Sequence, residues 1–371
     1  MPASHLVTEQ DPAAELDLPA EVQRILTEHM QVRRSEAADL DPAFAAAVEE
    51  LAGFVLGGGK RIRPTFAWWG WRAAGGAATG PEASAMLRAA SALELLQACA
   101  LVHDDLIDES DTRRGNPTVH RRFEQIHRAA GYRGDAGHFG SAAAVLLGDL
   151  ALAWADDMVH EAGLSPEALR RAFHPWRAMR TEVLAGQYMD VLGQVRRDEE
   201  PRAALRICEL KSASYTVRRP LEFGAQAAGA GPDALRALHR FGLDIGVAFQ
   251  LRDDLLGVFG DPEVTGKPAG DDLREGKRTV LIAEAFAAAR EQDDRHALDL
   301  LADVLGDADL DVARVERARE VLTRLGAVAA VEERITELTA SAMHALESGD
   351  LAEPAATRLA ELAVAVTDRI R

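Results

Sequence analysis

Cysteine, aromatic residues and long apolar runs are scarce in this 371-residue chain. The two cysteines, Cys99 and Cys208, lie in apolar, helical surroundings without metal-ligand spacing, which predicts reduced core thiols in a cytoplasmic protein. No run approaches about 18 consecutive apolar residues, so we expect no membrane span. The N-terminus lacks the basic and apolar regions of a signal peptide. We therefore expect a disordered tail over residues 1–18 and one domain over residues 19–371.

Basic residues are also outnumbered, because 42 Lys and Arg face 60 Asp and Glu, giving a formal net charge of −18. Nucleic acid is thereby excluded as the main partner, since phosphate backbones require a basic face. Small phosphorylated ligands are not excluded, because a local cation cluster or a bound Mg²⁺ can invert the potential of one cleft. The chain has only four lysines, so we hypothesise that each marks a place where a compact ammonium is needed.

Helical punctuation recurs along the whole chain. Residues 41–59 open with Asp-Pro and close on glycines, and residues 81–108 open with Pro and continue with Ala and Leu at helical intervals. Shorter amphipathic pieces cover 311–324, 328–347 and 352–370, whereas alternation typical of strands is almost absent. These patterns predict an all-α fold, a single large bundle of ten or more helices. Pro220 should kink or split the helix that carries Lys211.

The segment "HDDLIDESDTRRG" (103–115) places acidic side chains before two arginines. On a helix, Asp104 and Asp108 lie one turn apart on a stripe that also carries Gln97 and Ala100. Two carboxylates at that spacing suit Mg²⁺, which keeps several waters and is completed by phosphate oxygens. An acidic helix end in solvent would show the same spacing, so this motif alone decides little.

A second helix ends in Asp253 and Asp254, and the loop after it carries Lys267 and Lys277. Facing helices of this kind can place carboxylates around shared metal ions, and the lysines can neutralise a diphosphate. The segment "GGGKRIRP" (57–64) adds Lys60 and Arg63 behind glycines. Together these motifs predict two anionic ligands, one bound through metal and one bound directly by Lys and Arg.

Other acidic pairs and aromatic clusters carry less weight. Asp156–Asp157 and Asp293–Asp294 are interpreted as solvated helix faces or caps, whereas Asp271–Asp272 could shape the lysine-bearing loop. The tryptophans at positions 68, 69 and 71 are expected in the core.

In this combination and order, the motifs resemble the trans-isoprenyl diphosphate synthases of the polyprenyl synthetase family. The resemblance runs from about residue 40 to the end, through "GGGKRIRP", "LLQACALVHDDLIDESDTRRG", "GQYMD", "LKSASY" and "FQLRDDLLGVFGDPEVTGK". It implies an isoprenoid-synthase bundle around a central cavity, usually as a homodimer. It also implies small-molecule diphosphate substrates and three Mg²⁺ ions, with Mn²⁺ as an alternative ion.

The resemblance assigns roles residue by residue. As catalytic residues it implies Asp104, Asp108, Gln187, Lys211 and Asp253, with Asp190 beside the reacting centre, and as metal ligands Asp104, Asp108, Asp253 and Asp254. For isopentenyl diphosphate it implies Lys60, Arg63, Gln97 and Arg114, and for the allylic diphosphate Arg113, Lys211, Ser212, Gln250, Lys267 and Lys277. All four lysines thus fall on substrate positions, in agreement with the hypothesis from composition.

Two features separate the chain from the commoner family pattern. Gly257 stands where the second acidic motif commonly has a third Asp, and Gln97 stands where many bacterial members have His. The chain-length floor is expected at Cys99 and Ala100, with Leu93 and Leu96 further down. In the family, bulky aromatics at the first two positions stop growth at fifteen carbons. The small residues here favour geranylgeranyl diphosphate, at twenty carbons, or a longer product.

Two other classes stay open at this point. A class I terpene cyclase also uses an acidic helix in an all-α bundle, but it has no need of Lys60 and Arg63 for a second diphosphate. A non-catalytic partner subunit of a prenyl synthase should have lost one acidic motif, and Gly257 points weakly in that direction.

Overall fold

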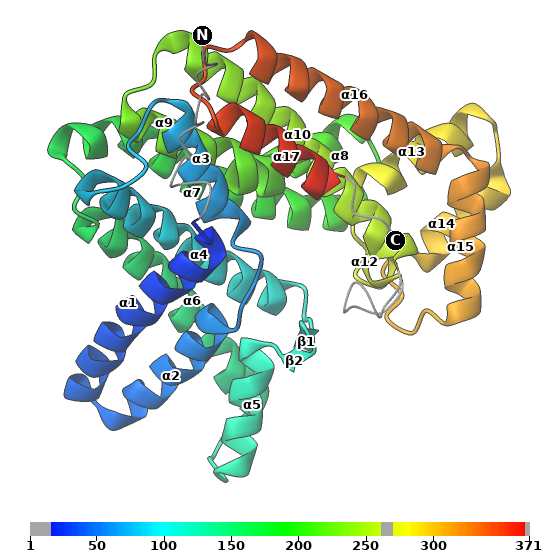
Figure 1. The fold of residues 1–371 in the computed structure, drawn as a ribbon. Coiled ribbons are helices and arrows are strands. Elements are labelled where there is room, and N and C mark those ends of the chain that lie inside the picture. Colours follow the sequence, from blue (N-terminus) through cyan, green and yellow to red (C-terminus); the bar gives the residue numbers. More distant parts are fainter. Residues whose placement is uncertain (1–15, 261–269, 368–371) are drawn as a thin grey trace, which may run out of the picture.

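The computed structural model describes residues 16–260 and 270–367, which form an almost entirely helical protein (Figure 1). The first half contains α1 (Leu18–Leu40), α2 (Pro42–Leu56), α3 (Ile62–Ala73), α4 (Pro81–Ile107), α5 (Val119–Ala129), α6 (Ala136–Glu161) and α7 (Pro166–Arg196). The second half contains α8 (Pro201–Ile207), the π-helix η1 (Cys208–Arg218), α9 (Arg219–Ala228), α10 (Pro232–Phe259), α12 (Asp271–Arg274), α13 (Val280–Glu291), α14 (Arg295–Val304), α15 (Val312–Arg324), α16 (Ala327–Ser348) and α17 (Ala355–Thr367). The all-α prediction of ten or more helices is confirmed.

Helix boundaries follow the capping signals. Asp41 accepts hydrogen bonds from the backbone N–H groups of Ala43 and Phe44, and Pro42 opens α2 as expected. Asp294 caps α14 in the same way, so the interpretation of Asp293–Asp294 as a solvated helix face or cap is confirmed. Helix α1 begins at Leu18, one residue before the predicted start of the domain, and the rest of the predicted tail up to residue 15 lies outside the described residues.

The core forms two clusters of buried residues that meet along α10. Phe241 and Ile245 of this helix belong to the larger cluster, with α1–α7, α9 and α17. Ala248 and Leu251, one to two turns later, belong to the smaller cluster, with α12–α16. In Figure 1, α1, α2 and α5 extend from one end of the bundle, and α13–α15 lie at the opposite side of α10. The predicted core tryptophans are 0–5% exposed.

The helix that carries Lys211 is wider than an α-helix. Its π-type turns continue directly into α9 at Arg219, so Pro220 marks a change of helix type without interrupting the helical path. Gly186 of α7 and Gly246 of α10 admit this width: a Cβ at position 186 would lie 2.4 Å from the backbone N of Lys211, and one at 246 would lie 2.7 Å from Cα of Ala213. π-Type turns are rare and concentrate at functional sites.

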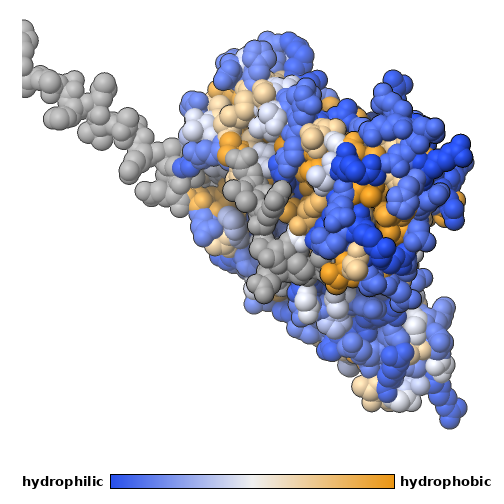
Figure 2. Space-filling model, turned by 90° about the vertical axis from the view of Figure 1, so that its right-hand side faces the viewer, coloured by the Kyte–Doolittle hydropathy of each residue, from blue (hydrophilic) through white to orange (hydrophobic). Residues whose placement is uncertain are grey.

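Polar side chains cover most of the face shown in Figure 2, and apolar residues are visible between them. By length and composition, α4 is the one helix among the described residues that could cross a membrane. However, 72% of its most apolar window is buried inside the protein, as expected of a central bundle helix.

Candidate active site

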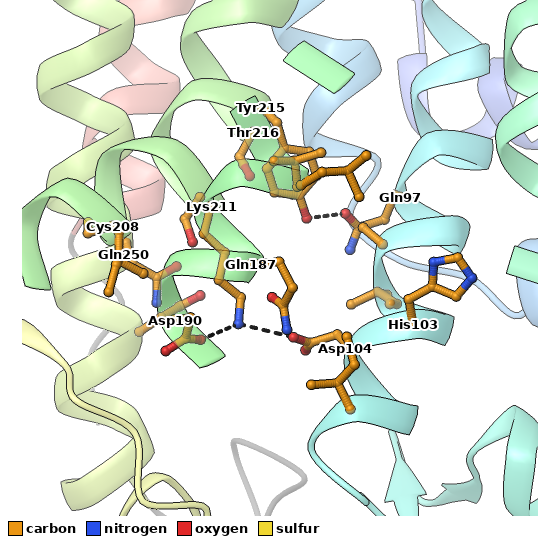
Figure 3. Close-up of a pocket in the computed structure, with 18 of the residues that line it drawn as sticks. Gln97, His103, Asp104, Gln187, Asp190, Cys208, Lys211, Tyr215, Thr216 and Gln250 are labelled. Carbon is orange, nitrogen blue, oxygen red and sulfur yellow. Dashed lines mark hydrogen bonds and ion pairs between the residues drawn. The ribbon is translucent and has the colours of Figure 1, made fainter. Parts of the chain in front are cut away.

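A cavity of 1290 Å³ lies among α4, α6, α7, η1 and α10 and reaches α12. Typical small-ligand pockets enclose about 300–1,000 Å³, so this cavity can hold more than one small substrate. Figure 3 shows its polar part, where side chains from α4, α7, η1 and α10 converge. Most of the residues singled out from the sequence line it. Their contacts define three groups: lysines and carboxylates at α4 and η1, an acidic pair at the end of α10, and a cationic group at the start of α3.

The first group is built on Lys211 of η1. Its Nζ lies 3.0 Å from Oδ1 of Asp104 on α4 and donates to Oδ2 of Asp190 on α7 at 2.6 Å (Figure 3). Burial disfavours the ionised form of Asp104, but Lys211, Lys277 and Arg113 outweigh it and hold the pKa of this carboxyl below its usual value. Burial likewise opposes the charge of Lys211, yet Asp104 and Asp190 raise its pKa. This lysine is therefore protonated where a diphosphate would need a positive charge.

Asp108, at the C-terminal cap of α4, faces Lys277. The two are 3.3 Å apart from Oδ2 to Nζ, and Glu275 also contacts the same ammonium. Burial, and then repulsion from Asp104, raise the pKa of Asp108 to about 6. Asp104 lines the cavity, whereas Asp108 lies behind it against Lys277. The predicted stripe on α4 is thus present, with its second carboxylate held by a loop lysine.

A two-residue hairpin carries the paired arginines. Strands β1 (Thr112–Arg113) and β2 (Asn116–Pro117) are antiparallel, and Arg114 and Gly115 form the turn with positive φ. Oδ1 of Asp105, a residue that is 0% exposed, accepts a hydrogen bond from Nε of Arg113 at 2.6 Å and forms an ion pair with NH2 of the same guanidinium at 2.5 Å. Both nitrogens contact this one oxygen, and NH2 of the same guanidinium lies 3.6 Å from Oδ2 of Asp104.

The second acidic pair lies at the end of α10. Asp253 and Asp254 both line the cavity, and Oδ1 of Asp254 accepts from Nε2 of Gln250 at 2.7 Å. Burial, and then repulsion from Asp272, raise the pKa of Asp254 to about 8. Buried carboxyl groups that repel one another can bind a cation, because its charge would offset the repulsion.

A separate cationic group lies at the start of α3. Arg63 donates to Oγ1 of Thr216 at 2.9 Å, and its guanidinium lies 4.2 Å from the ring centre of Tyr215. The Tyr215 hydroxyl in turn donates to Oε1 of Gln97 at 2.5 Å (Figure 3). Arg63 and Gln97 are thus brought together through η1, on the side of the cavity next to α3.

The loop before α3 is fixed by Arg61 and by the hairpin arginine. Arg61 adopts φ 48° and is 5% exposed; its NH1 donates to Glu94 at 2.6 Å, and its NH2 donates to Gln23 at 2.5 Å. NH1 of Arg114 donates to the carbonyl of Gly58 at 2.8 Å, which ties the hairpin to this loop. Burial, and then repulsion from Arg113, lower the pKa of Arg114. Lys60 is exposed at the mouth of the same cavity.

Three of the four residues expected at the chain-length floor line the cavity. Cys99, Ala100 and Leu96 line it, whereas Leu93 is fully buried in the core and does not. Leu152 of α6 and Arg180 of α7 also line the cavity. Asp156, interpreted as part of a solvated face, has a side chain that is 38% exposed and also accepts hydrogen bonds from NH1 of Arg180 at 2.7 Å and from the Trp176 indole at 2.6 Å.

The donor set fits Mg²⁺. Within residues 16–260 and 270–367, no group of three or more His, Cys, Asp or Glu could hold a metal ion alone. Mg²⁺ does not require such a cage, because it is bound by one or two carboxylates together with water and phosphate oxygens. Nε2 of Gln187 is buried beside Asp104 without a hydrogen-bond partner, so it is a donor available to a bound ligand (Figure 3).

The structure brings most predicted positions into one cavity and adds others. Ser212 lines the cavity, and Lys267 lies outside the described residues. Sequence reasoning missed Asp105, Tyr215, Thr216, Glu94 and Glu275. Asp105 points away from the metal stripe on α4, and only its partner Arg113, eight residues later, reveals its role. Tyr215 and Thr216 follow Lys211 by one turn, which was a usable signal.

Comparisons with known proteins match the chain along most of its length. A model of the polyprenyl synthetase family matches residues 45–322. Geranylfarnesyl diphosphate synthase of Aeropyrum pernix is 34% identical over 304 residues, covering 76% of this chain and 89% of that protein. Geranylgeranyl diphosphate synthase of Mycobacterium tuberculosis is 31% identical over 353 residues, covering 90% and 93%. A crystal structure of geranylgeranyl pyrophosphate synthase from Corynebacterium glutamicum, complexed with isoprenyl diphosphate and magnesium, has a TM-score of 0.91 and 45% identity, covering 95% and 99%.

Proposed function

Because the chain belongs to the polyprenyl synthetase family and is a prenyl-transferring enzyme, we propose that its cavity joins isopentenyl diphosphate to an allylic diphosphate and that the chief product is geranylgeranyl diphosphate. The observation that carries the two-substrate assignment is the presence of two cationic groups in one cavity. Lys211, Lys277 and Arg113 contact the carboxylates of α4, whereas Arg63 contacts η1 about one turn further along, near Gln97.

The first cationic group is assigned to the allylic diphosphate. Lys211 and Lys277 are positively charged and already point at Asp104 and Asp108, so both a metal ion and a diphosphate can be bound there. Ser212, Gln250 and Gln187 line the same part of the cavity and supply uncharged polar groups. Lys267 is assigned to this group from the family pattern.

The second cationic group is assigned to isopentenyl diphosphate. This group consists of Lys60, Arg63, Gln97 and Arg114, which line the cavity and include no acidic pair. The diphosphate bound here is therefore held directly by Lys and Arg, without a metal ion. A class I terpene cyclase has one diphosphate to bind and no use for this second group. The contact of Arg114 with Gly58 keeps both loops of the group in one place.

Asp104, Asp108, Asp253 and Asp254 would hold the magnesium ions, three by analogy with the family and replaceable by Mn²⁺. When bound, the ions neutralise the diphosphate and make it a better leaving group. Lys211 and Arg113 add positive charge where the allylic carbon–oxygen bond breaks and negative charge collects on the departing diphosphate. The apolar part of the cavity excludes water from the allylic cation, and the double bond of isopentenyl diphosphate attacks it. A proton then leaves the new chain to the departed diphosphate.

Product length follows from the depth of the apolar cavity. Eight residues of α4 separate Asp104 from Leu96, about 12 Å along the helix axis. Cys99 and Ala100 are small and leave this path open, and we assign its end to Leu96, which also lines the cavity. A change of Ala100→Phe should shorten the product, and an unchanged product would disprove the floor assignment.

We also propose a cytoplasmic homodimer formed through α6 and α7. Large apolar residues are exposed on both helices: Leu146 and Tyr188 are each 68% exposed and Leu184 is 54% exposed. Leu184 and Tyr188 also line the cavity, so a second copy would cover its side. Sedimentation velocity should show a dimer that Leu146→Glu weakens; a wild-type monomer would overturn the assignment.

One incubation series tests the reaction. Isopentenyl diphosphate is combined with dimethylallyl, geranyl or farnesyl diphosphate and Mg²⁺, and the products are dephosphorylated and sized. Elongation that ends at twenty carbons is expected, and Asp104→Ala should abolish it. Failure to elongate any primer would overturn the proposal, whereas a longer end product would overturn only the chain length.

A further inference from the structure

Gly257 stands in the last turn of α10, three residues after Asp254, where the commoner pattern of the second acidic motif has a carboxylate. The space that its side chain would fill is occupied. A Cβ built at position 257 would lie 2.0 Å from Oδ2 and 2.5 Å from Cγ of Asp272. The carboxylate of Asp272 therefore occupies the volume that the side chain of residue 257 would otherwise fill.

Asp272 is held in this place by α12. The next residue, Leu273, is 0% exposed and belongs to the smaller core cluster. Its carbonyl accepts from the backbone N–H of Gly306 at 2.8 Å, and the carbonyl of Asp272 accepts from the backbone N–H of Lys277 at 3.0 Å. The short helix is thus anchored on both sides, so the approach of Asp272 to Gly257 is a built contact.

Asp272 also faces the residues with which a third carboxylate should act. Asp253, Asp254, Gly257 and Asp272 all line the same cavity, together with Lys277. Asp271, its neighbour on α12, does not line it. Only one acidic residue of this pair is directed to the end of α10.

We propose that Asp272 is the third carboxylate of the second acidic motif, supplied by α12 in place of a side chain on α10. It helps to hold the hydrated Mg²⁺ of this motif, and position 257 is glycine because the Asp272 carboxylate fills its side-chain space. The proposal rests on the proposed function, since it assumes that Asp253 and Asp254 bind the ion. It also removes the feature that pointed towards a non-catalytic subunit.

The test is a Mg²⁺ titration with inorganic pyrophosphate as the probe, followed by the thermal shift of the full-length protein and, separately, by activity. Asp272→Asn keeps the shape and removes the charge, so the Mg²⁺ concentration at half-maximal shift should rise about tenfold. Asp271→Asn is the matched control and should titrate like the wild type. A purely structural role of Asp272 would lower the melting temperature without Mg²⁺ and leave the Mg²⁺ midpoint unchanged, which would overturn the proposal.

A second test moves the carboxylate from α12 back to α10. Gly257→Asp combined with Asp272→Ala returns the acid to α10 and vacates the space, so the Mg²⁺ midpoint should return to within about threefold of the wild type. Gly257→Asp alone should have a higher Mg²⁺ midpoint than the double variant, because two carboxylates then compete for one volume. If the double variant titrates no better than Asp272→Ala alone, the proposal is wrong. A wild-type protein without any Mg²⁺-dependent shift would instead refute the metal assignment in the proposed function.

Discussion

The buried ion pair between Arg61 and Glu94 should control both stability and the binding of isopentenyl diphosphate. Their side chains are 4% and 8% exposed, and Arg61 sits in a left-handed conformation that only its surroundings can maintain. Removing one partner of a buried pair typically costs about 3–5 kcal/mol. Because Arg61 keeps two other acceptors, Gln23 and the carbonyl of Val55, we expect about 3 kcal/mol for Glu94→Ala, at the lower limit of that range.

Glu94→Gln gives a graded comparison. Its amide oxygen can still accept from Arg61, and only the charge is lost, so we expect about 1–2 kcal/mol, the difference between a charged and a neutral hydrogen bond. Both variants release the loop that carries Lys60 and leads into Arg63. The KM for isopentenyl diphosphate should therefore rise about tenfold, which corresponds to about 1.4 kcal/mol of binding, while the KM for the allylic substrate changes little.

The assay is urea denaturation with a constant slope, together with steady-state kinetics at varied isopentenyl diphosphate. Glu82→Gln, an exposed acid in the first turn of the same helix, serves as the control. If Glu94→Ala unfolds at the same urea concentration as this control and keeps the wild-type KM, the pair does not position the loop and the reasoning fails.

Three further predictions concern other contacts. Asp105→Asn should raise the KM for the allylic diphosphate and destabilise the fold by about 3 kcal/mol, because the buried acid balances the charge of Arg113 and accepts its hydrogen bond; an unchanged urea midpoint would contradict this. Arg63→Lys keeps the charge but loses the planar fork over Tyr215, so kcat/KM for isopentenyl diphosphate should fall about tenfold, and equal kinetics would show that charge alone suffices. Burial opposes ionisation of Glu222, but His239 and Arg219 outweigh it and place its pKa below the ordinary 4.5, so its stabilising contribution is present above pH 4.5 and is lost as the pH falls through the lowered pKa. Urea midpoints measured across that range should therefore fall less steeply with acid in Glu222→Gln, and parallel curves would refute the assignment.

The helices and the acidic stripe could be predicted because their signals are local. Asp41–Pro42 sets the start of α2 through hydrogen bonds within three residues, and Asp104 and Asp108 share a face because of helix geometry alone. The cationic loops were found because lysine is scarce and because their motifs resemble a known family. In each of these cases the information lies within a few residues or in a motif.

What could not be predicted depends on contacts between distant segments. The π-type turns of η1 exist where Gly186 and Gly246 allow close approach from two other helices, which no pattern within residues 208–218 reveals. The hydrogen bond between Gln97 and Tyr215 joins residues 118 positions apart. Leu93 was expected at the cavity floor from its spacing on α4, but neighbouring helices enclose it in the core. Packing, rather than local propensity, decides these positions.

The scarcity of lysine has a consequence for chemical labelling of this enzyme. Lys60, Lys211 and Lys277, three of its four lysines, line the cavity. Neighbouring carboxylates keep Lys211 and Lys277 protonated, and a protonated amine is not nucleophilic, whereas Lys60 stands exposed at the cavity mouth. We therefore expect amine-directed reagents, such as acetylating agents, to modify the substrate cavity of this protein first at Lys60. In a lysine-rich protein the same reagents would react mainly with surface lysines that have no function.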